Sequence, residues 1–390
     1  MQRIKRFWLS AMLAGAAVAI TGAAAAGGYQ VEYAFGGGVD AAYPSGGLVG
    51  FGSKLFGTSG GGGGSGSIFA FDPATGAENV VYSFKGGADG SNPNGGLIMV
   101  GTKLWGTTFV GGSTTCGGGC GTVFSFDPAT GVETVVHAFQ HVESDGELPA
   151  SGLIEVGGVL FGTTKGGGPY GVGTLFSFNP ATGLETPVYV FKGMSDGELP
   201  TSNLIAVNGK LYGTTTSGGG TSCDSGGGCG TIFSFDPSTG AESVVYSFKS
   251  GNDGADPAAG LIDVGGKLYG TTVAGGGPNF GTVFSFDLNT GVERVVHAFA
   301  GRRDGMEPYE GLTRVGKNLY GTTLYGTATK IGTVFAVDLK THSERVMHVF
   351  KGGNDGSNPE GYLYPWNGKL YGESFDAGAH GYGAIFSINP

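Results

Sequence analysis

The sequence predicts an all-β protein, a seven-bladed β-propeller built from four-stranded antiparallel blades. Two observations predict it: a unit of roughly fifty residues recurs seven times, and each unit contains four short stretches typical of strands. A third observation is that the two ends of the chain hold complementary parts of one unit. Together these features indicate a closed ring of blades.

Two sequence elements mark the unit. A GTVFSF-like element has its first Phe at positions 69, 124, 176, 233, 284, 335 and 386. The other element resembles LYGTT, and its aromatic residues are 49 to 57 residues apart, at Phe56, Trp105, Phe161, Tyr212, Tyr269, Tyr320 and Tyr371. Periods of this length are typical of propellers and solenoids.

One unit contains four predicted strands. In order they are GLIDV from Gly260, KLYGTT from Lys267, GTVFSFD from Gly281 and ERVVHAF from Glu293. Each is rich in β-branched or aromatic residues and is bounded by glycine, proline or asparagine, which is the pattern of strands and turns. DPATG at Asp127 and its copies predict a tight turn between the third and fourth strands.

The two ends of the chain complete a seventh blade. The last unit ends at Pro390 without a fourth strand, and the segment Tyr29 to Phe35 is a fourth strand with no unit before it. Pairing the two removes the open sheet edges. We expect one domain, residues 27–390, with blades at residues 46–84, 95–139, 152–191, 203–248, 260–299, 311–350 and 361–390 plus 29–35.

The first 26 residues have the pattern of a signal peptide. Basic residues at Arg3, Lys5 and Arg6 precede the apolar run Phe7 to Ile20, and small residues up to Ala26 offer cleavage sites. An uncleaved membrane anchor is the alternative. We expect cleavage, no membrane span in the mature chain and a periplasmic or secreted protein.

Composition and charge exclude some partners. Glycine fills 83 of 390 positions, and the 26 Phe and 16 Tyr argue against disorder. The formal net charge is −10 with 21 Lys and Arg, whereas nucleic-acid binding needs a basic footprint. We expect a monomer that binds no nucleic acid, and the charge also disfavours polyanionic ligands.

The unit resembles the GloVer (Gloeo/Verruco) tandem-repeat family of exported bacterial proteins. The resemblance rests on LYGTT, GTVFSFDPATG, VVYSFKGG and DGxxP and covers essentially the whole mature chain. It implies an exported repeat domain, often joined to a surface anchor, and it implies no catalytic residue.

Most residues that could suggest chemistry recur in every blade and are interpreted as structural. The FxF pairs and the fourth-strand Phe predict packing between blades. Of the 31 Asp and Glu, 18 occupy the DP turns, the DGxxP elements or the start of the fourth strand, where turn caps are the expected role. DGxxP predicts an Asx-type turn instead of a calcium loop.

His137, His297 and His348 share a position with Tyr in other blades, which favours a half-buried structural role. We expect neither a metal nor a cofactor.

The four cysteines lie in two glycine-rich loops. Cys116 and Cys120 belong to the second blade, and Cys223 and Cys229 to the fourth. A zinc site would need these pairs to converge from blades that are not adjacent. An exported protein favours disulfides, so we predict Cys116 to Cys120 and Cys223 to Cys229.

Function is expected where a blade departs from the repeat on the rim shared by the DGxxP loops and the glycine-rich loops. The sixth and seventh blades depart most, and ordinary drift of terminal repeats is the alternative explanation. The candidate ligand-binding residues are Arg302, Arg303, Tyr309, Glu310, Tyr325, Lys330, Glu373, Asp376, His380 and Tyr382, with His141 and Tyr170 in the third blade.

Two hypotheses of different classes follow. The first is a binding or scaffolding propeller outside the cytoplasm whose rim holds a glycan or a protein. The second is a polysaccharide lyase or glycoside hydrolase on the same rim. In a lyase, His380 or Tyr382 would be the base and Arg302, Arg303 or Lys330 the cation. No spacing in the sequence demands that pairing, so no catalytic residue is assigned and the first hypothesis is favoured.

Overall fold

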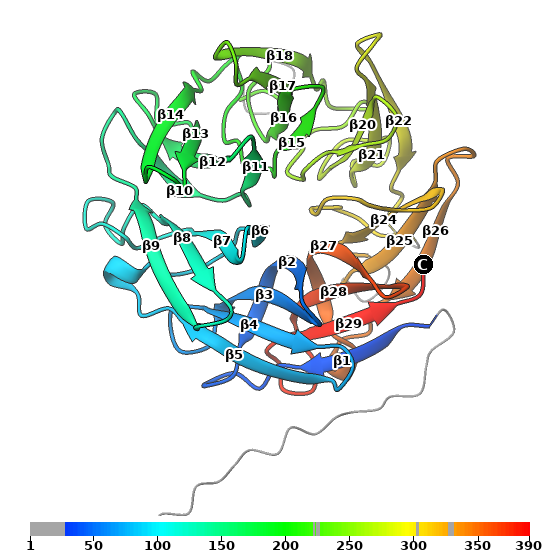
Figure 1. Cartoon of the computed structure of the whole chain (residues 1–390). Helices are drawn as coiled ribbons and strands as arrows, with labels where there is room; N and C mark the ends of the chain where they lie inside the picture. The colour runs from blue at the N-terminus through cyan, green and yellow to red at the C-terminus, as the bar shows by residue number, and fades with distance from the viewer. Residues whose placement is uncertain (1–27, 221–222, 224–226, 302–303, 327–330) are drawn as a thin grey trace, which may run out of the picture.

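Seven antiparallel sheets form a ring around a central axis in the computed structural model (Figure 1). The structure describes residues 28–220, 223, 227–301, 304–326 and 331–390. The predicted signal peptide, Arg302, Arg303 and Lys330 lie outside these residues. No helix in the described part of the chain has both the length and the apolar character needed to span a bilayer.

The first three blades follow the chain from the N-terminal side. Blade 1 contains β2 (Ala42–Phe51), β3 (Lys54–Gly61), β4 (Ser67–Asp72) and β5 (Ala77–Ser83). Blade 2 follows the short 3₁₀ helix η1 (Gly87–Asp89) and contains β6 (Ile98–Val100), β7 (Lys103–Thr108), β8 (Thr122–Asp127) and β9 (Val132–Ala138). Blade 3 contains β10 (Gly146–Pro149), β11 (Ile154–Val156), β12 (Val159–Gly167), β13 (Thr174–Asn179) and β14 (Leu184–Val190), where β10 and β11 both pair with β12.

The next three blades repeat the same order. Blade 4 contains β15 (Ile205–Val207), β16 (Lys210–Thr215), β17 (Thr231–Asp236) and β18 (Ala241–Ser247). Blade 5 contains β19 (Ile262–Asp263), β20 (Lys267–Thr272), β21 (Thr282–Asp287) and β22 (Val292–Ala298). Blade 6 contains β23 (Thr313–Val315), β24 (Asn318–Thr323), β25 (Thr333–Asp338) and β26 (Glu344–Val349).

Blade 7 joins the two ends of the described chain, as predicted. After the 3₁₀ helix η2 (Gly353–Asp355) come β27 (Ser357–Trp366), β28 (Lys369–Asp376) and β29 (Ala384–Ile388), and the outer strand is β1 (Gln30–Ala34). Figure 1 shows β1 in blue beside β29 in red. The β1–β29 pairing runs from Gln30 opposite Ser387 to Ala34 opposite Ala384. The predicted seven-bladed propeller and its closure are therefore confirmed.

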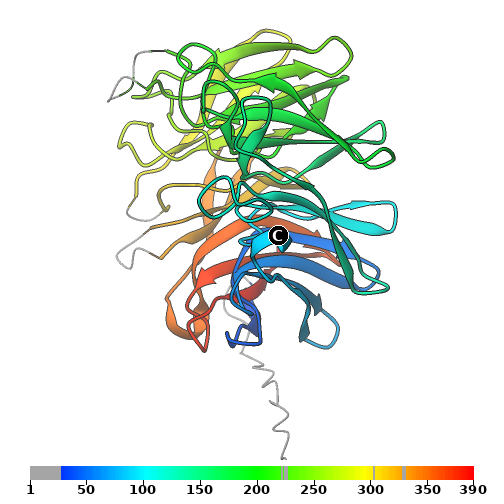
Figure 2. The same ribbon diagram turned by 90° about the vertical axis from the view of Figure 1, so that its left-hand side faces the viewer.

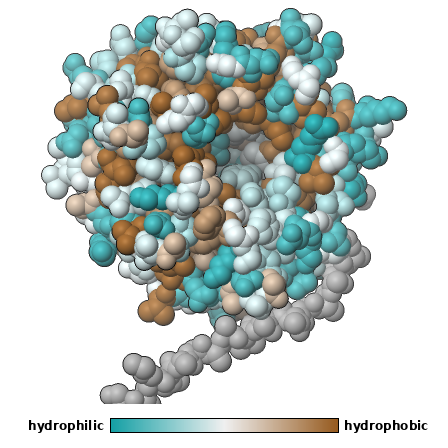
Figure 3. Space-filling model, in the orientation of Figure 1, coloured by the Kyte–Doolittle hydropathy of each residue, from teal (hydrophilic) through white to brown (hydrophobic). Residues whose placement is uncertain are grey.

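The strands cross the thickness of the ring, and the loops gather on its two faces (Figure 2). In the space-filling view along the axis, the centre of the ring is hollow (Figure 3). The innermost strand of each blade borders this hollow, so loops that enter the innermost strands bring residues from all seven blades toward one axis.

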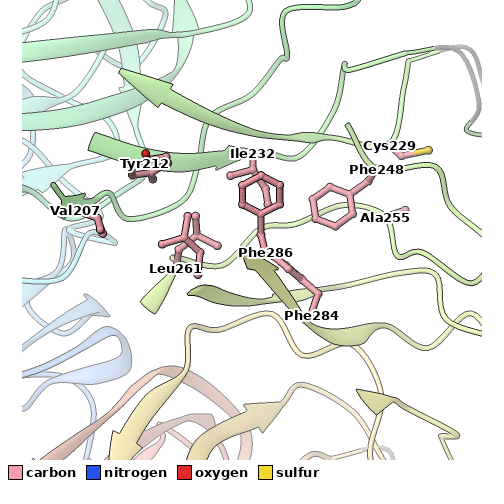
Figure 4. Packing of buried hydrophobic residues seen from close by; sticks show 10 residues of the cluster. Val207, Tyr212, Cys229, Ile232, Phe248, Ala255, Leu261, Phe284 and Phe286 are labelled. Carbon is pink, nitrogen blue, oxygen red and sulfur yellow. The ribbon is translucent and has the colours of Figure 1, made fainter. Parts of the chain in front are cut away.

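The core consists of one hydrophobic cluster at every interface between neighbouring blades. At each interface the fourth-strand Phe of one blade meets the first Phe of the next FxF pair edge to face, with ring centroids 5.1–5.4 Å apart. Phe248 and Phe284 show this contact between blades 4 and 5 (Figure 4). The predicted packing role of these aromatic residues is confirmed.

A backbone clasp also joins each blade to the next. The residue before each blade-opening proline has a positive φ and donates its N–H to the glycine-rich loop of the preceding blade, as Asp256 (φ 56°) does to the carbonyl of Cys229 at 3.0 Å. Here the proline packs on a glycine: a Cβ on Gly230 (φ +90°) would lie 2.5 Å from Cδ of Pro257. Only glycine fits this position, which explains why it opens each GTVFSF element.

Both predicted disulfides are present, Cys116–Cys120 and Cys223–Cys229. Each lies in the loop that receives the clasp of the following blade, because the carbonyl of Cys120 accepts from Leu148 just as that of Cys229 accepts from Asp256. The disulfides therefore fix the two loops against which blades 3 and 5 dock.

The recurring aspartates have two different roles. In the DP turns the interpretation as a cap is confirmed: Asp127 Oδ1, for example, accepts from the N–H of Ala129 at 2.9 Å. The Asx-type turn predicted for DGxxP is wrong. In Asp253 of this element, the carboxylate accepts from the backbone N–H of Lys249, four residues earlier, and from the hydroxyl of Tyr246. The carboxylate thus bonds to a residue that precedes it in the chain, and its other oxygen accepts from the aromatic side chain of the fourth strand.

The fourth-strand glutamates were expected to be turn caps, and this prediction is wrong. Their side chains lie between neighbouring blades. Each approaches the Asp and the Tyr or His of the preceding blade, and we call such a set an interface triad. The triads are Tyr33–Asp40–Glu78, Tyr82–Asp89–Glu133, His137–Asp145–Glu185, Tyr189–Asp196–Glu242, Tyr246–Asp253–Glu293 and His297–Asp304–Glu344. Burial raises the pKa of every glutamate in them, to values between about 7 and about 9.

Candidate functional site

A cavity of about 700 Å³ lies where the seven blades meet at the axis, in the size range of ligand pockets. Its wall includes residues of all seven blades. Most of them come from the three positions that follow the blade-opening prolines, which are Pro44, Pro93, Pro149, Pro200, Pro257, Pro308 and Pro359. The clasp described above fixes each proline, so these tripeptides are held at equivalent places around the axis.

The wall is asymmetric. The tripeptides are SGG, NGG, ASG, TSN and AAG in blades 1 to 5, but YEG in blade 6 and EGY in blade 7. The large residues are Tyr309, Glu310, Glu360 and Tyr362, and all four line the cavity. Small residues elsewhere leave room for a ligand, whereas blades 6 and 7 present aromatic rings and carboxyl groups to it.

Tyr362 reaches from blade 7 across the two following blades. A Cβ on Gly47 would lie 2.8 Å from Cε1 of the ring, and one on Gly96 would lie 3.3 Å from its hydroxyl oxygen. The ring therefore lies against the backbone of blades 1 and 2, and both glycines are needed for this approach. Tyr362 closes part of the channel and forms a firm side of the cavity.

Two carboxyl groups bridge neighbouring blades through backbone N–H groups. Gly47 of blade 1 donates to Oε2 of Glu373 at 3.1 Å, and Gly361 of blade 7 donates to the carboxyl group of Glu310. Glu373 is 1% exposed and its other oxygen has no hydrogen-bond partner. In the other blades a threonine stands at its position; Thr107, for example, donates to the carbonyl of Ser151 in blade 3.

The carboxyl groups of Glu310, Glu360 and Glu373 share one electrostatic environment. Glu360 lies opposite Glu373 on β27 and β28, and burial followed by the charges of Glu310 and Asp376 raises the pKa of Glu360 to about 8. Burial is also the main cause that raises the pKa of Glu310 and Glu373 above the ordinary value of 4.5. At neutral pH this wall therefore carries a protonated carboxyl group at Glu360, which can both donate and accept hydrogen bonds.

Further aromatic residues lie where blades 7 and 1 meet. Tyr43 packs on Phe375 with centroids 5.2 Å apart and on Tyr382 with centroids 5.9 Å apart. Tyr43 and Phe375 line the cavity, as does Lys165 of blade 3. Lys165 is exposed and is the cationic side chain among the described lining residues, opposite the acidic wall in the ring.

The structure brings together only part of the patch expected in blades 6 and 7. Tyr309 and Glu310 line the cavity, and Glu373 lies beside it under Glu360. Tyr382 contacts the cavity residue Tyr43. The remaining candidates within the described residues are outside the cavity lining: Tyr325, Asp376, His380 and Tyr170, of which His380 and Tyr170 are exposed, and His141, which pairs with Glu147 at 2.5 Å.

Sequence reasoning missed Glu360, Tyr362, Tyr43 and Phe375. The signal for Glu360 and Tyr362 was present, because aligning the three residues after each proline separates EGY from the small tripeptides of blades 1 to 5. No comparable signal marks Tyr43 and Phe375. They reach the cavity because the ring closes between blades 7 and 1.

The fold and this cavity define a closed β-propeller repeat protein with a ligand-sized recess on its axis. The chain belongs to the Gloeobacter/Verrucomicrobia repeat family, whose sequence model matches residues 14–227 and 219–390. This confirms the resemblance found from the repeat motifs. No curated protein matches the chain.

Solved structures share the fold at low sequence identity. A structure of oligogalacturonate lyase in complex with manganese is 14% identical, with a TM-score of 0.54 and 86% of each chain covered. The computationally designed Ika8 protein is 13% identical, with a TM-score of 0.51, 92% of this chain and 100% of that chain covered. The match to the tricorn protease has a TM-score of 0.48 and 14% identity and covers 85% of this chain, which spans only 27% of that protein.

Proposed function

We propose that this protein is a binding module that acts outside the cytoplasm and holds a neutral, hydroxyl-rich glycan in the axial cavity. The observation that carries the proposal is the asymmetry of the cavity wall. Five blades present tripeptides of small residues, and only blades 6 and 7 present Tyr309, Glu310, Glu360 and Tyr362. A recess with a few convergent polar groups and aromatic faces is the usual form of a small-ligand site.

The chemistry of the wall favours hydroxyl groups over anions. Carboxyl groups with a raised pKa, such as Glu360, donate and accept hydrogen bonds, as sugar hydroxyls do. Tyr309 and Tyr43 add flat apolar faces with polar tips. Lys165 is the one cationic residue among the described lining residues, so a polyanionic chain finds little compensation for its charge.

Binding measurements on the purified protein test the proposal. A panel of neutral, acidic and amino-sugar oligosaccharides is titrated by calorimetry against the wild type and the double variant Tyr309→Ala/Glu310→Ala. The variant restores the tripeptide of blade 5, Ala258, Ala259 and Gly260, so it should fold. We expect neutral oligosaccharides to bind the wild type and to bind the variant at least about tenfold more weakly.

The matched control is Tyr170→Ala. Tyr170 is 58% exposed and lies outside the cavity lining, so its loss should leave affinity unchanged. Equal binding by the wild type and the double variant would overturn the proposed site. If no oligosaccharide of the panel binds the wild type, the proposal that the cavity holds a glycan would be overturned.

A glycoside hydrolase is the second candidate, and the carboxyl pair Glu310 and Glu360 favours it. One protonated and one ionised carboxyl group can act as acid and base on a glycosidic bond, and Glu360 has a pKa of about 8. New reducing ends in the same panel, lost in Glu360→Gln, would support this function. Binding without new reducing ends supports the binding module.

A lyase and a protein partner have less support. The lyase hypothesis relied on His380 and Tyr382, which are not among the cavity-lining residues, and on Arg302, Arg303 and Lys330, which lie outside the described residues. A protein partner usually covers a broad surface, whereas the distinctive residues here converge in a recess.

A further inference from the structure

One interface triad lacks the contact that closes the others. In the tyrosine triads the hydroxyl donates to the aspartate over 2.6–2.9 Å, and His297 approaches Asp304 at 3.2 Å. In blade 2, His137 Nε2 is 3.6 Å from Asp145 Oδ2, is shielded from solvent and has no hydrogen-bond partner. A buried imidazole nitrogen without a partner needs an explanation.

The cause of the wider spacing is one additional residue in the loop between β9 and β10. Six positions separate Phe139 from Asp145, whereas five separate the equivalent Phe299 from Asp304. The backbone N–H of Gln140 still holds Asp145 Oδ2 at 2.8 Å. The loop therefore keeps the carboxylate fixed while moving it away from the imidazole.

The third member faces the same point from the next blade. Glu185 Oε2 is 3.8 Å from His137 Nε2, and its Oε1 is buried without a partner, as is Oε1 of the glutamate in each of the other triads. The three ligand atoms all lie within 4.8 Å of one another. The side chains of Asp145 and Glu185 are 8% and 6% exposed, and that of His137 is 21% exposed.

We propose that His137, Asp145 and Glu185 bind one divalent first-row transition metal ion, with zinc as the best fit, between blades 2 and 3. Zinc binds imidazole nitrogen and carboxylate oxygen at roughly 2.0–2.2 Å in a tetrahedral arrangement, which separates neighbouring ligand atoms by about 3.4 Å. The distances of 3.6 and 3.8 Å are close to that separation and too long for hydrogen bonds. Two carboxylates balance the charge of the ion, and a water molecule would complete the tetrahedron.

The chain contains its own comparison sites. His297, Asp304 and Glu344 are the same residue types in the equivalent place, but there the imidazole approaches Asp304 directly and needs no ion. A third group, Cys116, His141 and Glu147, includes a cysteine that is bound to Cys120 in a disulfide and so is no thiolate ligand. The repeat pattern alone predicts no metal, and the inserted residue is what distinguishes this interface.

The experiment uses the full chain, purified without a histidine tag, with its disulfides intact and after dialysis against a chelator. Equilibrium dialysis with Zn²⁺ measures the number of ions bound, and Co²⁺ absorption reports nitrogen and oxygen ligation. Variant His137→Tyr installs the residue found in four other triads, so it should fold. We expect one Zn²⁺ per wild-type chain and an affinity at least about 100-fold lower in the variant, since even residues around the ligands contribute 10- to 100-fold.

His297→Tyr is the matched control and should bind zinc as the wild type does. Glu185→Gln removes a ligand without changing the size of the side chain and should also lower affinity, which covers the case in which His137→Tyr fails to fold. Absence of stoichiometric zinc in the wild type would overturn the proposal. So would undiminished binding in Glu185→Gln, or loss of binding in His297→Tyr.

Discussion

The ring of Tyr29 stacks on the imidazole of His348, with centroids 3.5 Å apart and planes 2° apart. Tyr29 stands at the fourth-strand position that is glutamate in the other six blades. Its hydroxyl donates to the carbonyl of Asp355 at 2.6 Å, so β1 is joined to blade 6 as well as to β29. At the interface between blades 6 and 7 an aromatic ring thus takes the place that a glutamate has at the other six interfaces.

Replacing Tyr29 with alanine should loosen this closure. The side chain is 4% exposed and also contacts Phe350 and Phe386, so its removal leaves a cavity at the joint between the chain ends. We expect a loss of roughly 3–5 kcal/mol in the free energy of unfolding. Urea denaturation measures it, with the exposed Tyr170→Ala as control. Equal midpoints for both variants would show that the joint does not limit stability.

The fold was predictable because repetition shows the same strand order seven times, and the incomplete units at the ends have only one way to pair. The site was only partly predictable. Tyr309 and Glu310 were found as departures from the repeat, but His380, a departure in the glycine-rich loop of blade 7, lies at an exposed position outside the cavity lining. What selects a cavity residue is its place relative to the clasped proline, and the clasp becomes visible only in three dimensions.

The role of the fourth-strand glutamates depends on neighbours that are distant in sequence. Glu78 meets Asp40 and Tyr33, which belong to the preceding blade across the ring closure. Its position at the start of a strand suggested a cap, because sequence alone shows only the local turn. The raised pKa values follow from burial between blades, which no local pattern records.

Glu78→Gln should change the pH dependence of stability. Burial, with Asp40 as the next cause, raises the pKa of Glu78 from 4.5 to about 9. Such a group contributes its full stability below pH 4.5 and loses it as the pH rises toward 9, because over this range the carboxyl group ionises in the unfolded chain but stays protonated in the folded one. Glutamine stays neutral and can donate to Asp40, so the variant should match the wild type near pH 5 and exceed it near pH 9.

Thermal unfolding from pH 5 to 9 measures this difference. Asn79→Gln, at an exposed neutral position of the same strand, is the control and should follow the wild type throughout. A Glu78→Gln variant that parallels the wild type at every pH would contradict a neutral carboxyl group at this interface.

Removing the disulfides should weaken the docking of the following blades. Cys116–Cys120 and Cys223–Cys229 span only 4 and 6 positions, so the restriction of the unfolded chain is worth about 2 kcal/mol each. The double variants Cys116→Ser/Cys120→Ser and Cys223→Ser/Cys229→Ser should each lose about that much stability. Thiol titration of the unreduced, denatured protein should find no free thiols, and four free thiols would refute the pairing.

Tyr362→Gly tests how the cavity obtains its shape. Glycine is the residue at this position in blades 1, 2, 3, 5 and 6, so the variant restores the repeat and should fold. It also removes the ring that lies against Gly47 and Gly96, which opens the channel beside Glu360. If the ring forms one side of a glycan site, affinity should fall about tenfold, the equivalent of about 1.4 kcal/mol.

Calorimetry against the best oligosaccharide of the panel measures the change. Affinity equal to that of the wild type would mean that a bound glycan does not reach Tyr362 and that the site is confined to the outer part of the cavity near Tyr309.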